Sequence, residues 1–231
     1  MSDSQPPHRL TIAIDGPAGA GKSTIAARLA RKLGYVNLES GAMYRALALK
    51  AIENDISFDD EPSLLRLANN SRIVLEPSPT GNRVLLNGKD VSQRIREQDV
   101  SEAASRVSIH PKVREWMVEH QRAMGQGGGV IMEGRDIGTK VFPDADVKIF
   151  LDAAPEVRQD RRLRQHAMSG REQAAAVAAE IQERDRRDRT RAASPLVPAE
   201  DAIIIDSSAL SIEDVEAAIE KAVREKLARI S

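Results

Sequence analysis

An eight-residue loop near the start of the chain has the residue types and spacing of a phosphate-binding site. Residues 16–23 read GPAGAGKS, which matches the pattern G-x-x-x-x-G-K-[ST] at every fixed position. Glycines let consecutive backbone N–H groups face one concavity, and the lysine adds a full positive charge near the β- and γ-phosphates. The hydroxyl in the last position is a ligand for Mg²⁺. The loop therefore predicts binding of a nucleoside triphosphate together with Mg²⁺.

The loop motif also predicts which residues bind the triphosphate. The alternative, a glycine-rich turn that only joins a strand to a helix, explains neither the Lys-Ser pair nor the apolar residues on both sides. We expect Lys22 to take part in catalysis and Ser23 to ligate the metal. The complete set expected to contact ATP is Gly16, Pro17, Ala18, Gly19, Ala20, Gly21, Lys22, Ser23 and Thr24.

Two pairs of polar residues follow short apolar runs that we interpret as strands. Ser40 and Arg45 come after Tyr-Val-Asn-Leu, and Arg135 and Asp136 come soon after Val-Ile-Met. An arginine offers a forked grip on a phosphate, and charges at the end of a strand are typical of functional sites in α/β folds. Ser40 could instead cap a helix, and Arg135 and Asp136 could form an ion pair in a surface turn. Both interpretations are open at this point.

A third cluster, ERDRRDRTR at residues 183–191, is dominated by arginine. Four of its residues share one face of a helix: Arg184, Arg187, Asp188 and Arg191. A surplus of arginine on one face favours an anionic partner, and a mobile helix could close these side chains over substrate phosphates. The alternative is a solvent-exposed helix stabilised by opposite charges at i,i+4 spacing, such as Arg184 with Asp188 and Asp185 with Arg189.

These clusters need a sheet whose strands all end on one side. Besides the strand before the phosphate loop, apolar runs at 35–38, 130–133, 147–152 and 202–206 predict four more strands. Helices are expected over 22–33, 40–54, 100–107, 111–124, 155–168, 171–191 and 211–228. The alternation predicts a doubly wound α/β fold with a five-stranded parallel sheet and ligands at the carboxyl ends of the strands.

One stretch departs from this alternation. Residues 72–76 and 83–87 are β-type runs separated by the turn sequence PSPTGN, which predicts an antiparallel hairpin. We interpret residues 61–97 as a subdomain inserted into a core formed by residues 10–60 and 98–231. The chain, residues 1 to 231, is then a single unit.

Composition sets the class of protein. The chain has 231 residues, 41% hydrophobic and 30% charged, with a formal net charge of -1 and no cysteine. These values suit one soluble globular unit and exclude a disulfide scaffold. The balance of charge does not favour nucleic-acid binding, and no apolar run is long enough to span a membrane. Residues 1–8 predict a frayed polar leader and not a signal peptide, so we expect a cytoplasmic protein.

Four segments, taken in order, resemble the bacterial cytidylate kinases, which are nucleoside monophosphate kinases. They are IDGPAGAGKST, ESGAMYR, EGRDIGTKVFPDADVKIFLDA and ERDRRDRTRAASPLVPAEDA, and the resemblance runs from about Leu10 to the end. It implies a P-loop NTPase-type core, a monophosphate-binding subdomain enlarged by the insert, and an arginine-rich helical lid over about residues 155–195. It also implies a monomer that transfers the γ-phosphate of ATP, with Mg²⁺, to CMP or dCMP, without a covalent intermediate.

The resemblance also implies which residues bind the acceptor. Contacts to the monophosphate and its sugar are expected from Ser40, Arg45, Arg135, Arg184, Asp188 and Arg191, and contacts to the base from Ser105, Arg114 and Asp136. A carboxylate such as Asp136 accepts from the N4 amino group of cytosine, whereas uracil would turn an oxygen toward it. Arg187 and Arg191 should share the charge of the transferred group with Lys22.

Two positions depart from the family's pattern, and two other functions fit the phosphate loop by itself. Glu39 and Glu133 stand where the family commonly has aspartate, and both keep the charge. A kinase acting on UMP, dTMP or shikimate would share the loop and differ in its acceptor site. A nucleotide-switched regulatory module would need switch segments and a partner surface, whereas the arginine cluster beside a second substrate pocket favours a kinase.

Overall fold

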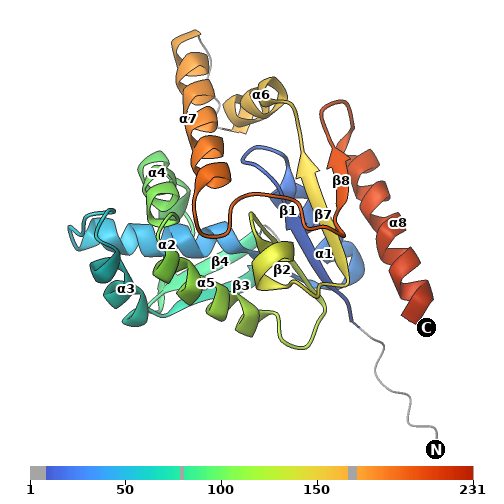
Figure 1. Ribbon diagram of the computed structural model, residues 1–231, viewed down its shortest axis with the longest axis horizontal. Helices are drawn as coiled ribbons and strands as arrows, with labels where there is room; N and C mark the ends of the chain where they lie inside the picture. The colour runs from blue at the N-terminus through green and yellow to red at the C-terminus, as the bar shows by residue number, and fades with distance from the viewer. Residues whose placement is uncertain (1–8, 79–80, 166–170, 231) are drawn as a thin grey trace, which may run out of the picture.

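The computed structural model describes residues 9–78, 81–165 and 171–230. Its central sheet has five parallel strands in the order β2-β6-β1-β7-β8 (Figure 1). The strands are β1 (Thr11–Asp15), β2 (Val36–Glu39), β6 (Val130–Gly134), β7 (Val147–Asp152) and β8 (Ile203–Asp206). The predicted five-stranded parallel sheet is confirmed, so the polar residues that follow the strands gather at one edge.

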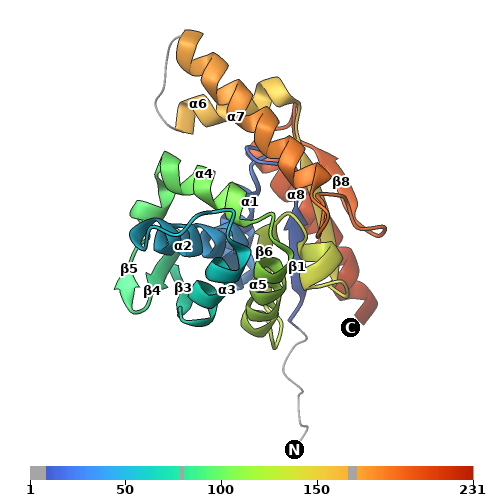
Figure 2. The same ribbon diagram turned by 60° about the vertical axis from the view of Figure 1, so that its left-hand side comes forward.

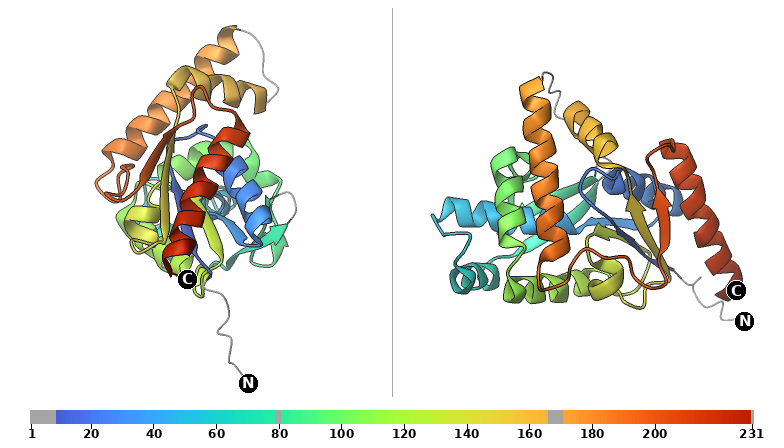
Figure 3. Two further views of the ribbon diagram at one scale, coloured as in Figure 1. Left: turned by 90° about the vertical axis from the view of Figure 1, so that its right-hand side faces the viewer. Right: turned by 45° about the horizontal axis from the view of Figure 1, so that its top comes forward.

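Helices cover both faces of this sheet. Along β1, Ile12 and Ile14 join the apolar core beneath α1 (Lys22–Leu33) and α8 (Ile212–Ile230), whereas Ala13 joins the core on the opposite face. Successive side chains of a strand point to opposite faces, so a strand buried on both sides is apolar throughout. Figure 3 shows α1 and α8 together on one side of the sheet. The doubly wound arrangement is confirmed.

The opposite face carries four helices and a second sheet. The helices are α2 (Ser40–Glu53), α3 (Glu61–Asn69), α4 (Gln98–Val107) and α5 (Pro111–Met124). The second sheet is antiparallel, with β3 (Ile73–Ser78), β4 (Gly81–Leu86) and β5 (Lys89–Asp90) in that order. It lies against α2 (Figure 2), and its first two strands confirm the predicted hairpin. The division of the chain into core and inserted subdomain stays a prediction.

Two helices project beyond the carboxyl ends of the strands, as Figure 1 shows. They are α6 (Pro155–Gln165) and α7 (Arg171–Thr190), which pack against each other. Two short turns were not predicted, the 3₁₀ turn η1 (Arg94–Arg96) and the π-helical turn η2 (Ile137–Val141). The predicted leader over residues 1–8 and the predicted helix break at Ser169 and Gly170 lie outside the described residues.

Across the described part of the chain, none of the helices combines the length and the apolar character that crossing a bilayer requires.

Candidate functional site

The phosphate loop lies between β1 and α1, at the edge where the strands end. Gly16 has φ +147°, and a Cβ at this position would lie 1.9 Å from the carbonyl oxygen of Leu151 on the neighbouring strand. Only glycine fits so close to another backbone. Gly19, with φ +78°, packs against Arg158, whose Cβ would be 3.1 Å from an added Cβ. Gly16 and Gly19 thus lie against neighbours on β7 and α6 that leave little or no room for a side chain.

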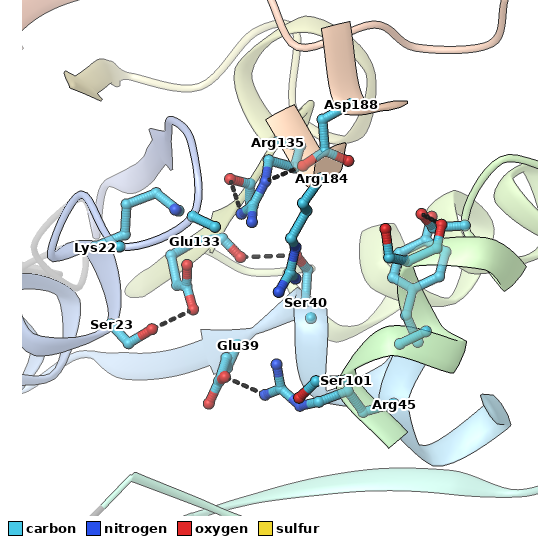
Figure 4. A pocket seen from close by; sticks show the side chains of 18 of the residues that line it. Lys22, Ser23, Glu39, Ser40, Arg45, Ser101, Glu133, Arg135, Arg184 and Asp188 are labelled. Carbon is cyan, nitrogen blue, oxygen red and sulfur yellow. Dashed lines mark hydrogen bonds and ion pairs between the residues drawn. The ribbon is translucent and has the colours of Figure 1, made fainter. Parts of the chain in front are cut away.

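Two side chains of the loop are already oriented by the protein (Figure 4). Lys22 Nζ donates to the carbonyl oxygen of Pro17 at 2.7 Å, and Ser23 Oγ donates to Glu133 Oε1 at 2.8 Å. Burial lowers the pKa of Lys22 to about 7, with a further lowering by the charge of Arg135. An anion beside this amine would reverse the effect, so the loop is arranged for a negatively charged ligand.

A cavity of about 670 Å³ extends from this loop to α4, α5 and α7. All nine residues expected to bind the acceptor line it: Ser40, Arg45, Ser105, Arg114, Arg135, Asp136, Arg184, Asp188 and Arg191. Ala18, Gly19, Lys22, Ser23 and Thr24 of the phosphate loop line it too. Segments far apart in the sequence are therefore brought to one cavity. Of the other expected residues, Gly16, Pro17, Ala20 and Gly21 belong to the same loop without lining the cavity.

Arg187 is the expected site residue that lies elsewhere. Its Nε donates to Glu183 Oε1 at 2.7 Å, one turn earlier on α7, and its Nη1 lies 3.4 Å from Ser105 Oγ. The side chain is about one-quarter exposed, at 27%. A catalytic role for Arg187 would require this ion pair to open.

One end of the cavity has a buried ion pair suited to reading a base. Arg114 Nη2, on α5, donates to Asp136 Oδ2 at the end of β6, and the two side chains are 3% and 6% exposed. Asp15 at the end of β1 accepts from the amides of Ile137 and Gly138, which fixes the turn that follows Asp136. The alternative of a surface turn closed by Arg135 and Asp136 is wrong, because Asp136 is buried and pairs with α5.

The middle of the cavity has arginines from two elements around one carboxylate. Asp188 Oδ2 accepts from Arg135 Nε at 2.8 Å, and Asp188 Oδ1 accepts from Arg191 Nη1 at 3.0 Å. Asp185 accepts from Arg158 Nη2 at 2.6 Å. The predicted alternative paired Asp185 with Arg189 and Asp188 with Arg184 along the helix. The two aspartates instead accept from arginines outside that helix, Arg158 and Arg135. Their bonds tie α7 to β6 and α6.

Positive charge exceeds negative charge at this point. Arg184 extends from α7 toward Ser40 (Figure 4). Burial lowers the pKa of Arg184 to about 10, and the charge of Arg135 lowers it further. Lys22 and Arg184 are thus both destabilised as cations by burial and by Arg135. Such a cluster is stabilised by an anion with several oxygens, and phosphate groups have that chemistry.

The start of α2 corrects one interpretation of the sequence. Ser40 does not cap the helix: it is the first residue of α2, and its hydroxyl donates to the carbonyl oxygen of Glu133 at 2.7 Å. Arg45 pairs with Glu39, while its buried Nε has no partner. A donor left without a partner at the wall of the cavity favours a ligand at this position.

Sequence reasoning missed two arginines that support the phosphate loop. Arg158 Nη1 donates to the carbonyl oxygen of Ala18, and Arg161 Nη1 to that of Ala20, both at 3.1 Å. Both lie on α6, directly after a strand of the parallel sheet, and their spacing of three puts them on one helix face. Their position after a strand and their spacing of three residues could have identified them from the sequence.

The donor set at Ser23 fits Mg²⁺. Among the described residues, no group of three or more His, Cys, Asp or Glu side chains is placed to hold a metal. Mg²⁺ in phosphate-transfer sites takes one or two protein oxygens and completes its shell with phosphate and water. The Ser23 hydroxyl and the Glu133 carboxylate, 2.8 Å apart, supply hard oxygen ligands of that kind.

Sequence comparisons with known proteins agree on one family. The family model described as "Cytidylate kinase" matches residues 12–225. A curated cytidylate kinase of Pelotomaculum thermopropionicum is 55% identical, covering 88% of this chain and 91% of that protein. One from Enterococcus faecalis is 48% identical, with coverages of 94% and 97%. A crystal structure of an uncharacterized protein from Eubacterium ventriosum shares the fold, with TM-score 0.50, 11% identity and coverages of 94% and 99%. The chain belongs to the cytidylate kinase family.

Proposed function

We propose that the protein transfers the γ-phosphate of ATP to CMP or dCMP, giving ADP and CDP or dCDP. One observation carries the proposal for this chain: the phosphate loop and the buried Arg114–Asp136 pair line the same cavity. A triphosphate held at the loop and a nucleotide base held at the pair would place two phosphate groups among the arginines between them. Family membership supports cytosine as the base.

The acceptor base would be read at the Arg114–Asp136 pair. The Asp136 carboxylate accepts a hydrogen bond from an amino group such as N4 of cytosine, while Arg114 donates to the ring's acceptor atoms. Uracil would place its O4 against Asp136, leaving two buried acceptors facing each other, which is costly. Ser105 lies at the same end of the cavity and is 7% exposed.

The transfer step would rely on position and charge. The attacking oxygen belongs to a phosphate that is ionised at neutral pH, so no general base is needed. Lys22 and Arg135 would lie beside the transferred group, and Arg184 and Arg191 would approach it from α7. Closure of α6 and α7 would exclude water and give Arg187 access to the phosphates.

Mg²⁺, bound by the Ser23 hydroxyl and by Glu133 either directly or through water, would neutralise part of the phosphate charge. Ser23 and Glu133 keep one another in place when they hydrogen-bond at 2.8 Å. The proposal includes a monomer in the cytoplasm, with residues 61–97 as an inserted subdomain, residues 155–195 as the lid, and no nucleic-acid or membrane partner. These points rest on the family resemblance and composition.

A panel of acceptors tests the proposal. ADP release from ATP and Mg²⁺ is measured with CMP, dCMP, UMP, dTMP and shikimate at equal concentrations. We expect CMP and dCMP to give far higher kcat/KM values than the others. A preference for UMP would contradict the assignment of Asp136. Slow hydrolysis of ATP with no acceleration by any acceptor would contradict the kinase and support a regulatory module.

A further inference from the structure

The side chain of Asn82 joins the inserted sheet to the central sheet. Asn82 lies on β4 and is 5% exposed. Its Oδ1 accepts from the backbone N–H of Glu39 at 2.8 Å, and its Nδ2 donates to the carbonyl oxygen of Asn37 at 2.7 Å. The two bonded groups of β2 lie on either side of one residue, Leu38. One side-chain amide thus binds the strand that ends at the acceptor site.

The pattern of these two bonds is that of a parallel sheet. In a parallel ladder, one residue donates to the carbonyl of residue i−1 on its neighbour and accepts from the N–H of residue i+1. The amide of Asn82 does both around Leu38. Among the described strands, β2 is the edge of the sheet and pairs with β6 alone, so its outward groups would otherwise need water or another partner. Asn82 therefore takes the place of a sixth strand for one residue pair.

The bonded residue Glu39 is linked to two residues of the proposed acceptor site. Ser40, the next residue, donates to the Glu133 carbonyl, and Arg45 pairs with the Glu39 carboxylate (Figure 4). A shift of the backbone at Glu39 would move both contacts. We propose that Asn82 is a positioning residue, which fixes the junction of β2 and α2 and thereby aims Ser40 and Arg45 at the acceptor phosphate. This inference rests on the proposed function.

The kinetic test compares two substitutions on one strand. Asn82→Ala removes both bonds, and Asn82→Asp keeps the acceptor for Glu39 but sets an oxygen against the Asn37 carbonyl. Arg83→Ala is the matched control, because Arg83 is the next residue on β4, is half exposed at 53%, and pairs with Glu76 and Asp90. We expect both Asn82 variants to raise KM for CMP about tenfold. KM for ATP should change less than about twofold in all three variants.

Three kinetic outcomes would overturn the positioning role. They are an unchanged KM for CMP in Asn82→Ala, an equal rise of both KM values, and the same rise in Arg83→Ala. An equal rise would indicate general destabilisation, which thermal unfolding of each variant would detect independently. If the wild-type protein does not phosphorylate CMP at all, the proposed function fails, and the positioning role fails with it.

Hydrogen exchange tests the bond itself in the wild-type protein, whether or not the variants fold. The Glu39 amide should exchange slowly, like the amides that face β6, although it lies on the outer side of an edge strand. Exchange of this amide at the rate of an unbonded one would contradict the proposal. This measurement does not depend on activity, so it separates failure of the Asn82–Glu39 hydrogen bond from failure of the proposed function.

Discussion

The proposed donor side and the proposed acceptor side of the cavity are built in different ways. The donor side is one continuous loop, residues 16–24, of which Ala18, Gly19, Lys22, Ser23 and Thr24 line the cavity. The acceptor side is assembled from side chains on α2, α4, α5, β6 and α7. Its charged groups are held by pairs such as Arg114–Asp136, 22 residues apart, and Arg135–Asp188, 53 residues apart. A local loop can be recognised from its letters, whereas an assembled site depends on the packing of many elements.

The two sides also differ in how their charge is balanced. On the acceptor side, most arginines pair with a carboxylate, as Arg114 does with Asp136, and buried Arg184 is an exception among the described residues. On the donor side, Lys22 is buried and its pKa is lowered to about 7. The buried lysine therefore costs stability until an anion binds, whereas removing one partner of an acceptor pair leaves the other charge buried without compensation. Substitutions on the two sides should have different consequences.

The largest effect is expected on the donor side, from Lys22→Met. This change removes the charge nearest the transferred group and keeps the length of the side chain, so turnover should fall by about 10³-fold or more while the fold is retained. Steady-state ADP release and circular dichroism measure the two quantities. Lys221→Met is the matched control, because Lys221 is exposed on α8, away from the cavity. A near-normal rate in Lys22→Met would remove the lysine from the mechanism.

A smaller effect is expected on the acceptor side, from Asp136→Asn. The amide group reverses part of the hydrogen-bonding pattern offered to the base, so kcat/KM for CMP should fall by about 10- to 100-fold. The preference for CMP over UMP should narrow at the same time, and the melting temperature should fall because Arg114 loses its charged partner. Competition between the two acceptors measures the preference. Asp144→Asn, at an exposed position, is the control. An unchanged preference would move base recognition elsewhere.

A third expected effect concerns pH and the stability of the protein without nucleotide. The pKa of Lys22 is about 7 in the folded protein and near its ordinary value of 10.5 when unfolded, so the unfolded state binds more protons between these values. The free energy of unfolding contributed by Lys22 therefore rises with pH above 7. Relative to Lys22→Met, the wild type should gain stability from pH 7 to 10, measured by denaturant unfolding. A constant difference between the two proteins would contradict this.

The pH range matters because the stability contribution of a second buried group, Asp15, changes with pH in the opposite direction. Burial raises the pKa of Asp15 to about 7, so this carboxyl makes the protein less stable as pH rises from about 4 to 7. The charge of Lys22 lowers the pKa of Asp15, so the Asp15 contribution differs between the wild type and Lys22→Met at any pH where Asp15 titrates. Well above pH 7, Asp15 is ionised in the folded and the unfolded state alike, so measurements there report on the lysine.

The sequence predicted the fold class well, for physical reasons that apply locally, and the nine residues it proposed for the acceptor line one cavity. Apolar runs fixed the five strands, and the hairpin followed from a turn sequence between two β-type runs. The sequence left open whether Ser40 caps a helix, and the cap is wrong because the Ser40 hydroxyl donates to the carbonyl oxygen of Glu133, a partner that the sequence cannot show. It also missed Arg158 and Arg161, whose contacts with the phosphate loop cross more than a hundred residues of chain.

By itself, the sequence determined the phosphate loop and the strands that flank it. That information is local, because each glycine serves a backbone turn and Lys22 follows at a fixed offset. Only the tertiary structure decided that Asp188 pairs with Arg135, that Asp136 faces Arg114, and that Asn82 completes the edge of β2. Spacing rules reach four residues along a helix and two along a strand, and they say nothing about partners on separate elements. The phosphate loop could therefore be identified from its sequence, whereas the side-chain partners around it could be known only from the tertiary structure.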